Sequence, residues 1–258
     1  MNRHEERDGI RTFKVRGRTW SDRETRLYLT KGYHGIIYEP WGRKADNSLD
    51  FLRDLPDLHA LYLSGDIGDD RILTDIEGLR KLVIEYRSRW PIDLTGMSST
   101  LEWLDLAWHP QMTLPTCPRL ETLIISGYQA SSFTPLGDHP RLKNLDLTIK
   151  RGTTVSVSGL KGLRSLESLS ISSGKLNDWQ DDSIPSSLRT AIFERATGID
   201  LRFAKGTPLL GHLYLERCGS VPSVQPLAEC ESLSRAALDH TLIEDDSAPV
   251  MERWAEFR

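Results

Sequence analysis

The sequence predicts a solenoid, a fold in which one short structural unit repeats and each unit packs mainly against its neighbours. Three observations predict it. One pattern of apolar residues, apolar-x-x-apolar-x-apolar, occurs nine times. Successive copies begin 19 to 24 residues apart, a period typical of solenoids. A further apolar position recurs thirteen residues after most copies begin, which predicts a second buried column on the other side of each turn.

Each copy of the pattern begins with leucine and contains a short stretch of alternating side chains. The nine copies begin at Leu58, Leu79, Leu101, Leu120, Leu142, Leu166, Leu188, Leu210 and Leu233. Side chains along a strand point to opposite faces in turn. Within the first copy, Leu61 and Leu63 are therefore expected to face the core, and Tyr62 the opposite side. The second column comprises Ile92, Leu114, Phe133, Val155, Trp179, Leu201 and Val224.

The pattern resembles the leucine-rich repeat family, and the resemblance covers about residues 49–245. It implies an α/β-type solenoid, a right-handed superhelix with a parallel concave β-sheet of about ten strands. Segments around Pro135-Leu136 and Pro226-Leu227 resemble the short-repeat, internalin-like branch, whose convex side carries turns and short 3₁₀ segments. The ninth motif position is usually Asn or Cys in the family, and only Cys218 matches. The turns are therefore expected to satisfy their backbone groups through neighbouring backbone or water.

A solenoid exposes core residues at both ends, so both ends should carry caps. Residues 1–48 are predicted to form an N-terminal tail, a β-rich cap and a degenerate first repeat, with strands around 10–15, 27–29 and 35–38. Ser21-x-x-Glu24 leaves a short helix at 21–29 as the alternative. Residues 49–245 form the solenoid. Residues 246–258 are predicted to be a capping helix, because apolar residues recur there at helical spacing. Structural packing is expected for Trp20, Trp41, Trp90, Trp179 and Trp254.

Composition favours a water-soluble protein of the cytoplasm. Charged residues make up 27% and apolar residues 38%, a globular balance. The chain has no apolar run of about 18 residues and no apolar N-terminal stretch typical of a signal peptide. Three cysteines without paired spacing fit a reducing compartment. The whole chain has a net charge of −4 and its body is acidic, so we expect a poor nucleic-acid binder. We expect a monomer with neither a nucleic-acid nor a membrane partner.

The side chains that leave the concave sheet occupy the third, fifth and seventh motif positions, with the eighth at its edge. Aromatic and apolar residues gather around one acid in the first four repeats, a composition typical of an interface hot spot. This predicted aromatic patch comprises Tyr62, Val83, Tyr86, Trp103, Asp105, Trp108 and Ile124. The alternative is that the N-terminal cap folds over these rings, or that the rings pack on one another.

A second predicted patch lies on later repeats and is mainly charged. This charged patch comprises Glu194, Arg195, His212, Tyr214, Glu216 and Arg217, with Asp239 beside it. Its alternative interpretation is a set of solvated cross-strand ion pairs, which contribute little to stability.

The sequence contains no recognisable catalytic or cofactor motif. It has no H-x-x-x-H or H-E-x-x-H pair, no C-x-x-C and no phosphate-binding glycine motif, so no metal or cofactor is expected. Ser170, Asp146 and His212 share the concave side but fall on separate strands. The resulting prediction is a non-catalytic module that binds a partner protein through its concave face. The alternative is a dedicated inhibitor or immunity protein that sequesters one enzyme or toxin, a role the family resemblance allows.

Overall fold

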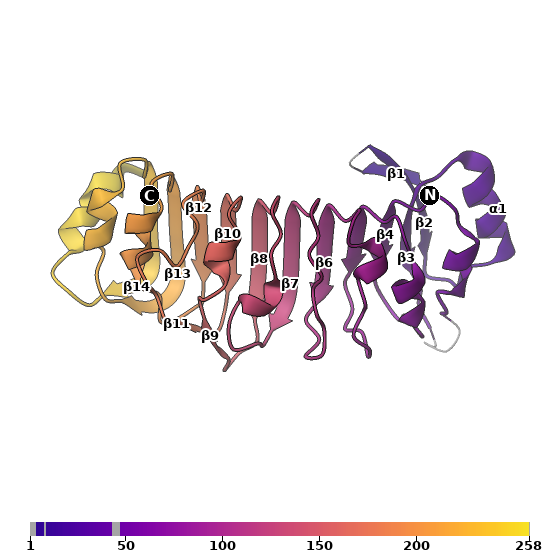
Figure 1. Ribbon diagram of the computed structural model, residues 1–258, viewed down its shortest axis with the longest axis horizontal. Coiled ribbons are helices and arrows are strands. Elements are labelled where there is room, and N and C mark those ends of the chain that lie inside the picture. The colour runs from indigo at the N-terminus through magenta and orange to yellow at the C-terminus, as the bar shows by residue number, and fades with distance from the viewer. Residues whose placement is uncertain (1–3, 8, 43–46, 258) are drawn as a thin grey trace. The chain divides into compact units, whose positions relative to one another are not determined.

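The computed structural model describes residues 4–7, 9–42 and 47–257. The chain divides into two compact units, Met1–Leu120 and Glu121–Arg258. In both, short strands stack side by side and are joined by loops that carry 3₁₀ turns (Figure 1). This is a leucine-rich repeat solenoid with parallel strands, so the predicted fold class is confirmed.

The first unit is built on a sheet that begins with an antiparallel pair and continues with parallel strands. β1 pairs antiparallel with β2, and β2 to β6 pair in parallel in chain order. Its elements are β1 (His4–Arg7), β2 (Ile10–Arg16), α1 (Asp22–Lys31), β3 (Gly35–Glu39), η2 (Asp50–Asp54), β4 (Ala60–Leu63), η3 (Arg71–Asp75), β5 (Lys81–Ile84), η4 (Thr95–Met97) and β6 (Trp103–Ala107).

The second unit is a parallel sheet with a small additional sheet at its turns. Strands β7, β8, β10, β12, β13 and β14 pair in that order, and β9 pairs with β11. Its elements are β7 (Thr122–Tyr128), η5 (Thr134–Leu136), β8 (Asn144–Ile149), β9 (Thr154–Ser156), η6 (Leu160–Gly162), β10 (Ser168–Ser172), β11 (Lys175–Asn177), β12 (Thr190–Glu194), η7 (Leu201–Gly206), β13 (His212–Val221), η8 (Gln225–Glu229), β14 (Arg235–Ile243) and η9 (Ala248–Phe257).

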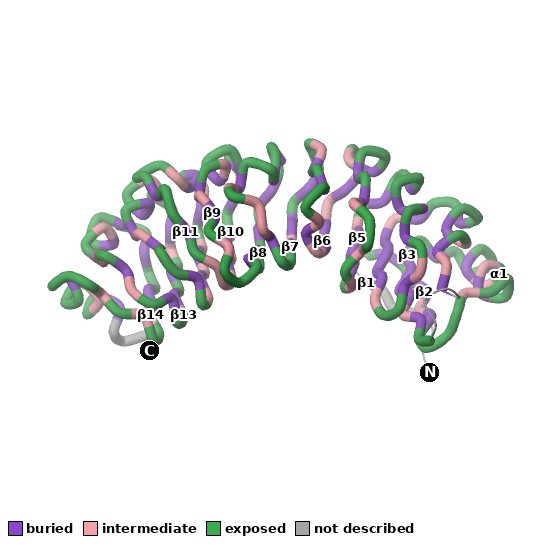
Figure 2. Tube along the Cα trace, turned by 90° about the horizontal axis from the view of Figure 1, so that it is seen from below, coloured by how far each residue is buried: buried purple, intermediate pink, exposed green. Residues whose placement is uncertain are grey.

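The core follows the predicted register. The first, fourth and sixth motif positions are buried in every repeat except at Leu238, which is half-buried on the last strand. The second column is buried throughout, as predicted. Figure 2 shows the same alternation within each unit, where buried segments recur along the trace between exposed turns. Burying one leucine-sized side chain stabilises the folded chain by roughly 1.5–3 kcal/mol. Because the pattern repeats this gain in every turn, it determines the fold.

In the turns that follow the strands, backbone groups form hydrogen bonds with the backbone of neighbouring repeats. They replace the hydrogen bonds of the Asn side chains that the family usually carries at the ninth motif position. Lys175 donates its backbone N–H to Thr153 over 2.9 Å, and Thr197 donates its own to Gly174 over 3.0 Å. Cys218 is the one family-like residue at the ninth position, and its Sγ lies 3.2 Å from the carbonyl oxygen of Phe193. The sequence-based expectation of neighbouring backbone partners holds at these turns.

The N-terminal segment contains a helix where one of the predicted strands was expected. α1 covers residues 27–29, so the helical alternative is the correct one there. Ser21 is the N-cap residue and its hydroxyl bonds to Glu24, while Gly32 ends the helix in the left-handed conformation and donates to the Tyr28 carbonyl. The short polar stretch before Leu27 forms the N-terminus of the helix. This helix-start signal determines the local structure, although the apolar residues that follow suggested a strand.

The tryptophans expected to be structural divide into two groups. Trp20 stacks on Phe51 with ring centres 4.2 Å apart, Trp179 is buried, and Trp254 donates to the Leu233 carbonyl from a buried position. Trp41 and Trp90 are instead 67% and 50% exposed, so the expectation of packing was wrong for them. The C-terminal segment expected as a helix forms η9, which is 3₁₀ in character.

Candidate functional site

The surface available for binding is the outer face of each sheet, defined here as the open face. It carries the third, fifth and seventh motif positions. Strands β6, β10 and β12 each show a half-buried, buried, half-buried alternation, so their odd motif positions reach this face as predicted. Neighbouring strands lie about 4.8 Å apart, which arranges the side chains of each position as a row across the unit.

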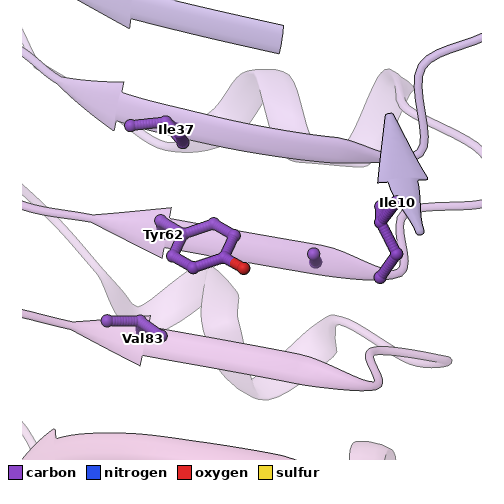
Figure 3. Close-up of a cluster of buried hydrophobic side chains, with 5 residues drawn as sticks. Ile10, Ile37, Tyr62 and Val83 are labelled. Atoms are coloured by element: carbon purple, nitrogen blue, oxygen red, sulfur yellow. The ribbon is translucent and has the colours of Figure 1, made fainter. Parts of the chain in front are cut away.

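In the first unit, the open face is already partly covered. Tyr62 and Val83 are only 8% and 7% exposed, and they pack with Ile10, Ile37 and Ala60 in one apolar cluster (Figure 3). The expectation of exposed side chains was wrong at Tyr62 and Val83. The residue responsible is Ile10, at the start of β2, which the sequence placed in a cap without indicating that it would reach this face.

A close approach between β2 and β3 allows this cover. A Cβ atom on Gly35 would lie 2.6 Å from the Thr12 hydroxyl and 3.1 Å from a methyl group of Ile10. Because glycine has no side chain, Ile10 and Thr12 can lie directly over the strand that Gly35 begins. Thr12 is fully buried, and its hydroxyl donates to the Ile10 carbonyl. For Tyr62 and Val83, the alternative that the N-terminal cap covers the aromatic patch therefore applies.

The eighth motif position does not present its aromatic rings at the edge of the open face. Trp108 is 5% exposed, and Tyr86 is half-buried with its hydroxyl 3.2 Å from a carboxylate oxygen of Asp70. Burial, followed by the negative charge of Asp70, raises the pKa of the Tyr86 phenol. The expected exposure of Trp108 was wrong, and the residue follows the last residue of β6, Ala107, so the alternation of the strand no longer fixes its direction.

Trp103 and Asp105 remain partly accessible on β6, at the margin of the apolar cluster. Lys81 on the neighbouring strand places Nζ 4.1 Å from the Trp103 ring centre and 5.5 Å from the Tyr62 ring centre. A cation over an aromatic ring is attracted by the electron-rich ring face. Ile124, the last predicted member of the patch, is half-buried on β7 in the second unit.

The charged patch lies on two adjacent strands of the second unit, as predicted. β12 and β13 pair so that Ile192 lies beside Tyr214 and Glu194 beside Glu216. The ion pairs form between consecutive residues rather than across strands. Arg195 lies 2.9 Å from Glu194, and Arg217 lies 3.5 Å from Glu216. His240 and Asp239 repeat the arrangement on β14 at 2.8 Å.

The basic members of these pairs adopt a backbone conformation that the sequence did not reveal. Arg195, Arg217 and His240 have φ angles of 52°, 53° and 49°, in the left-handed region. Side chains raise the energy of this conformation by roughly 1–2 kcal/mol. Gly65 and Gly127 hold the same eighth position in other repeats, with φ of 81° and 70°. Those glycines are the signal from which the left-handed turn could have been predicted.

Tyr214 stands out within the charged patch. It is 37% exposed and lies between Ile192 and Ala237 on the neighbouring strands. Its hydroxyl is 3.4 Å from a carboxylate oxygen of Glu216. Loss of hydration, then the charges of Glu216 and Asp239, raise the pKa of the Tyr214 phenol. An exposed ring surrounded by carboxylates can accept both apolar and cationic groups.

Of the three polar residues that could form a catalytic triad, the structure brings only Ser170 and Asp146 together. Ser170 and Asp146 are partners on β10 and β8, and the serine hydroxyl bonds to the Asp146 carboxylate, whereas His212 lies on β13 with β12 between. Within residues 4–7, 9–42 and 47–257, no cluster of three His, Cys, Asp or Glu side chains could hold a metal ion. None of the described helices has the length and apolar character needed to cross a membrane.

Comparison with known proteins gives structural similarity alone. No protein-family model matches the sequence, and no curated protein matches it. Internalin C2 from Listeria monocytogenes matches 74% of this chain and 75% of its own, with 18% identity and a TM-score of 0.49. The plant peptide hormone receptor RGFR1, solved in complex with RGF2, matches 87% of this chain with 16% identity and a TM-score of 0.59. The chain spans 38% of that receptor's length.

Proposed function

We propose that this leucine-rich repeat chain is a non-catalytic protein-binding module, which recognises a partner protein through the open face of its sheets. Side chains on that face are held at fixed spacing by strands whose opposite side is the core. Such preorganisation lowers the entropy lost when a partner binds. In this proposal the module works in the cytoplasm, where its three buried cysteines would stay reduced.

Tyr214 is the observation that carries the proposal. Of the large apolar side chains that are exposed in the described part of the chain, only Tyr214 holds a third, fifth or seventh motif position. The others are found on turns, on α1 or beyond the motif of the last strand. Exposed tyrosines contribute strongly to interfaces because they bury a large area and lose little side-chain entropy.

The charge around Tyr214 favours a partner with basic residues. Glu194, Glu216 and Asp239 form a row at the seventh motif position on three neighbouring strands. The residues that pair with them, Arg195, Arg217 and His240, follow at the eighth position in the left-handed turn. The carboxylates thus lie on the sheet itself and the cations at its edge. A lysine or arginine of the partner could approach the row and the Tyr214 ring together.

Trp103 and Asp105 form a separate candidate surface, on the open face of the first unit. Both side chains are half-buried, and Trp103 packs against the covered cluster. Tyr62 and Val83 are buried in the cluster against which Trp103 packs.

The test is affinity capture with the full chain immobilised, followed by titration calorimetry with the purified partner. Tyr214→Ala should weaken binding by about 2 kcal/mol, roughly thirty-fold. Leu209→Ala is the matched control, because Leu209 is 43% exposed on the turn before β13 and lies off the open face. The control should bind like the wild type.

Three results would reject the proposal: no protein captured specifically, equal losses in both variants, or no loss for Tyr214→Ala. Stoichiometry then distinguishes the two roles considered from the sequence. One partner retained in equimolar amount indicates a sequestering inhibitor or immunity protein, and several partners indicate a scaffold.

A further inference from the structure

The second unit contains a basic groove beyond the carboxyl ends of β8, β10 and β12, away from the rows of the open face. Its volume is about 500 Å³, within the usual range for ligand sites. The side chains relevant to binding come from three consecutive repeats. They are Arg151, Thr154, Ser173, Lys175, Arg195 and Thr197.

Backbone pairing fixes the central row of this groove. Lys175 at the start of β11 pairs with Thr154 on β9 and forms an isolated bridge with Thr197 on its other side. The next residues on β9 and β11, Val155 and Leu176, are buried. Because side chains alternate along a strand, Thr154 and Lys175 face solvent, and both are exposed. One ammonium group is thereby flanked by two hydroxyl-bearing residues.

Glycines keep the groove open near this row. Gly152 and Gly174 line it with φ of 79° and 77°. A Cβ atom on Gly174 would lie 2.4 Å from the Ile149 side chain, so the backbone passes directly over the core at this point. Glycine at position 174 is therefore set by the core, whereas Gly152 borders open space, in which a Cβ atom would meet nothing within 4 Å.

The charge of the groove is one-sided. Its lining includes three cations and no carboxylate. Arg195 pairs with Glu194, which lies outside the lining. Arg151 and Lys175 have no ion-pair partner in the described part of the chain. Both cations line the same groove, and an anion bound there would offset the repulsion between them.

We propose that this groove binds a phosphate monoester dianion. Two guanidinium groups can each donate two parallel hydrogen bonds to phosphate oxygens, while the Lys175 ammonium supplies a compact charge. The hydroxyls of Thr154 and Ser173 add donors, while the Thr197 hydroxyl already donates to the Gly174 carbonyl. Three cations suit a doubly charged phosphoryl group better than a singly charged carboxylate. The group could belong to a free small phosphate or to a phosphorylated side chain on a protein, and neither source depends on the function proposed for the open face.

Titration calorimetry on the full chain at low ionic strength tests this site with three ligands. Inorganic phosphate and N-acetyl-phosphoserine amide represent the two sources, and acetate is the singly charged comparison. We expect saturable one-to-one binding of at least one phosphate ligand, and at least ten-fold weaker binding of acetate. Phosphate binding without phosphoserine binding assigns a free phosphate, and binding of both admits a phosphorylated side chain.

Lys175→Gln and Arg151→Gln should each weaken phosphate binding at least ten-fold. Lys205→Gln removes the same charge from an exposed lysine on η7 that pairs with Glu229, and it should bind like the wild type. Circular dichroism establishes that each variant folds. The proposal is overturned if neither phosphate ligand binds saturably, if acetate binds as tightly, or if Lys205→Gln loses as much affinity as Lys175→Gln.

Discussion

Lys81 Nζ lies 4.1 Å from the centre of the Trp103 ring, on the strand next to it in the first unit. The two residues are register partners at the third motif position, so the contact follows directly from the parallel pairing. The same ammonium group is 5.5 Å from the Tyr62 ring. One lysine on the open face therefore lies near a buried and a half-buried aromatic ring, at the margin of the apolar cluster.

We expect Lys81→Gln to lower the free energy of unfolding by about 0.5–1 kcal/mol, because the amide keeps much of the stem but loses the cation. A double-mutant cycle with Trp103→Leu measures the pairwise part by urea denaturation. The loss at Lys81 should shrink when Trp103 is absent. If both single losses simply add, the contact contributes nothing to stability.

Leu123→Ala and Leu145→Ala should each destabilise the second unit by about 2–5 kcal/mol, because both residues are fully enclosed by the core and truncation leaves a cavity. Ser170→Ala, on the open face of β10, should change stability by less than about 0.5 kcal/mol. Chemical denaturation of the three variants compares the two faces. Similar losses at Leu123 and Ser170 would contradict the register observed in the sheet.

The sequence was sufficient to predict the strand register, because its information is periodic. Each motif places leucine-type residues at the same three positions, and a shift by one residue would expose all of them at once. Leu104 and Leu106 on β6 are buried and Trp103 and Asp105 are not, as that argument requires. Nothing comparable constrains the N-terminal segment, which lacks a clear copy of the motif, and there the helix α1 was only an alternative.

The candidate site was harder to predict because exposure depends on contacts between distant segments. Ile10 covers the row containing Tyr62, and this contact is not encoded in the motif. Trp108 was assigned to the edge of the sheet by counting positions, but β6 ends at Ala107 and Trp108 is buried. The six-residue motif specifies direction within a strand and says nothing about the residues after it.

Two glycines of the first unit should differ in their tolerance of alanine. Gly65 and Gly78 have φ of 81° and 76°, so alanine raises the energy at both by roughly 1–2 kcal/mol. At Gly65 the new Cβ would also lie 2.6 Å from the Pro40 carbonyl oxygen, whereas Gly78 has open space. Gly65→Ala should therefore unfold at a lower urea concentration than Gly78→Ala. Equal urea midpoints for the two variants would mean that the Pro40 carbonyl moves away from the new Cβ atom at no cost in free energy.

His139 should make the second unit less stable in mildly acidic solution. Its side chain is fully buried between η5 and β8, and burial lowers the pKa of the imidazole below its ordinary value near 6.5. The unfolded chain therefore binds a proton at a higher pH than the folded chain. Stability from this residue is complete above the unfolded pKa and is lost as pH falls from there toward the folded pKa.

Urea denaturation at several pH values between 8 and about 5 measures this effect. His139→Asn removes the titrating group and keeps a polar side chain of similar reach, so its stability should fall less steeply over the same range. The comparison uses the slope of each variant against pH, which is independent of any constant loss caused by the substitution itself. Parallel curves for wild type and His139→Asn would show that protonation of His139 does not oppose folding, and that its buried ring is compensated by neighbours in both charge states.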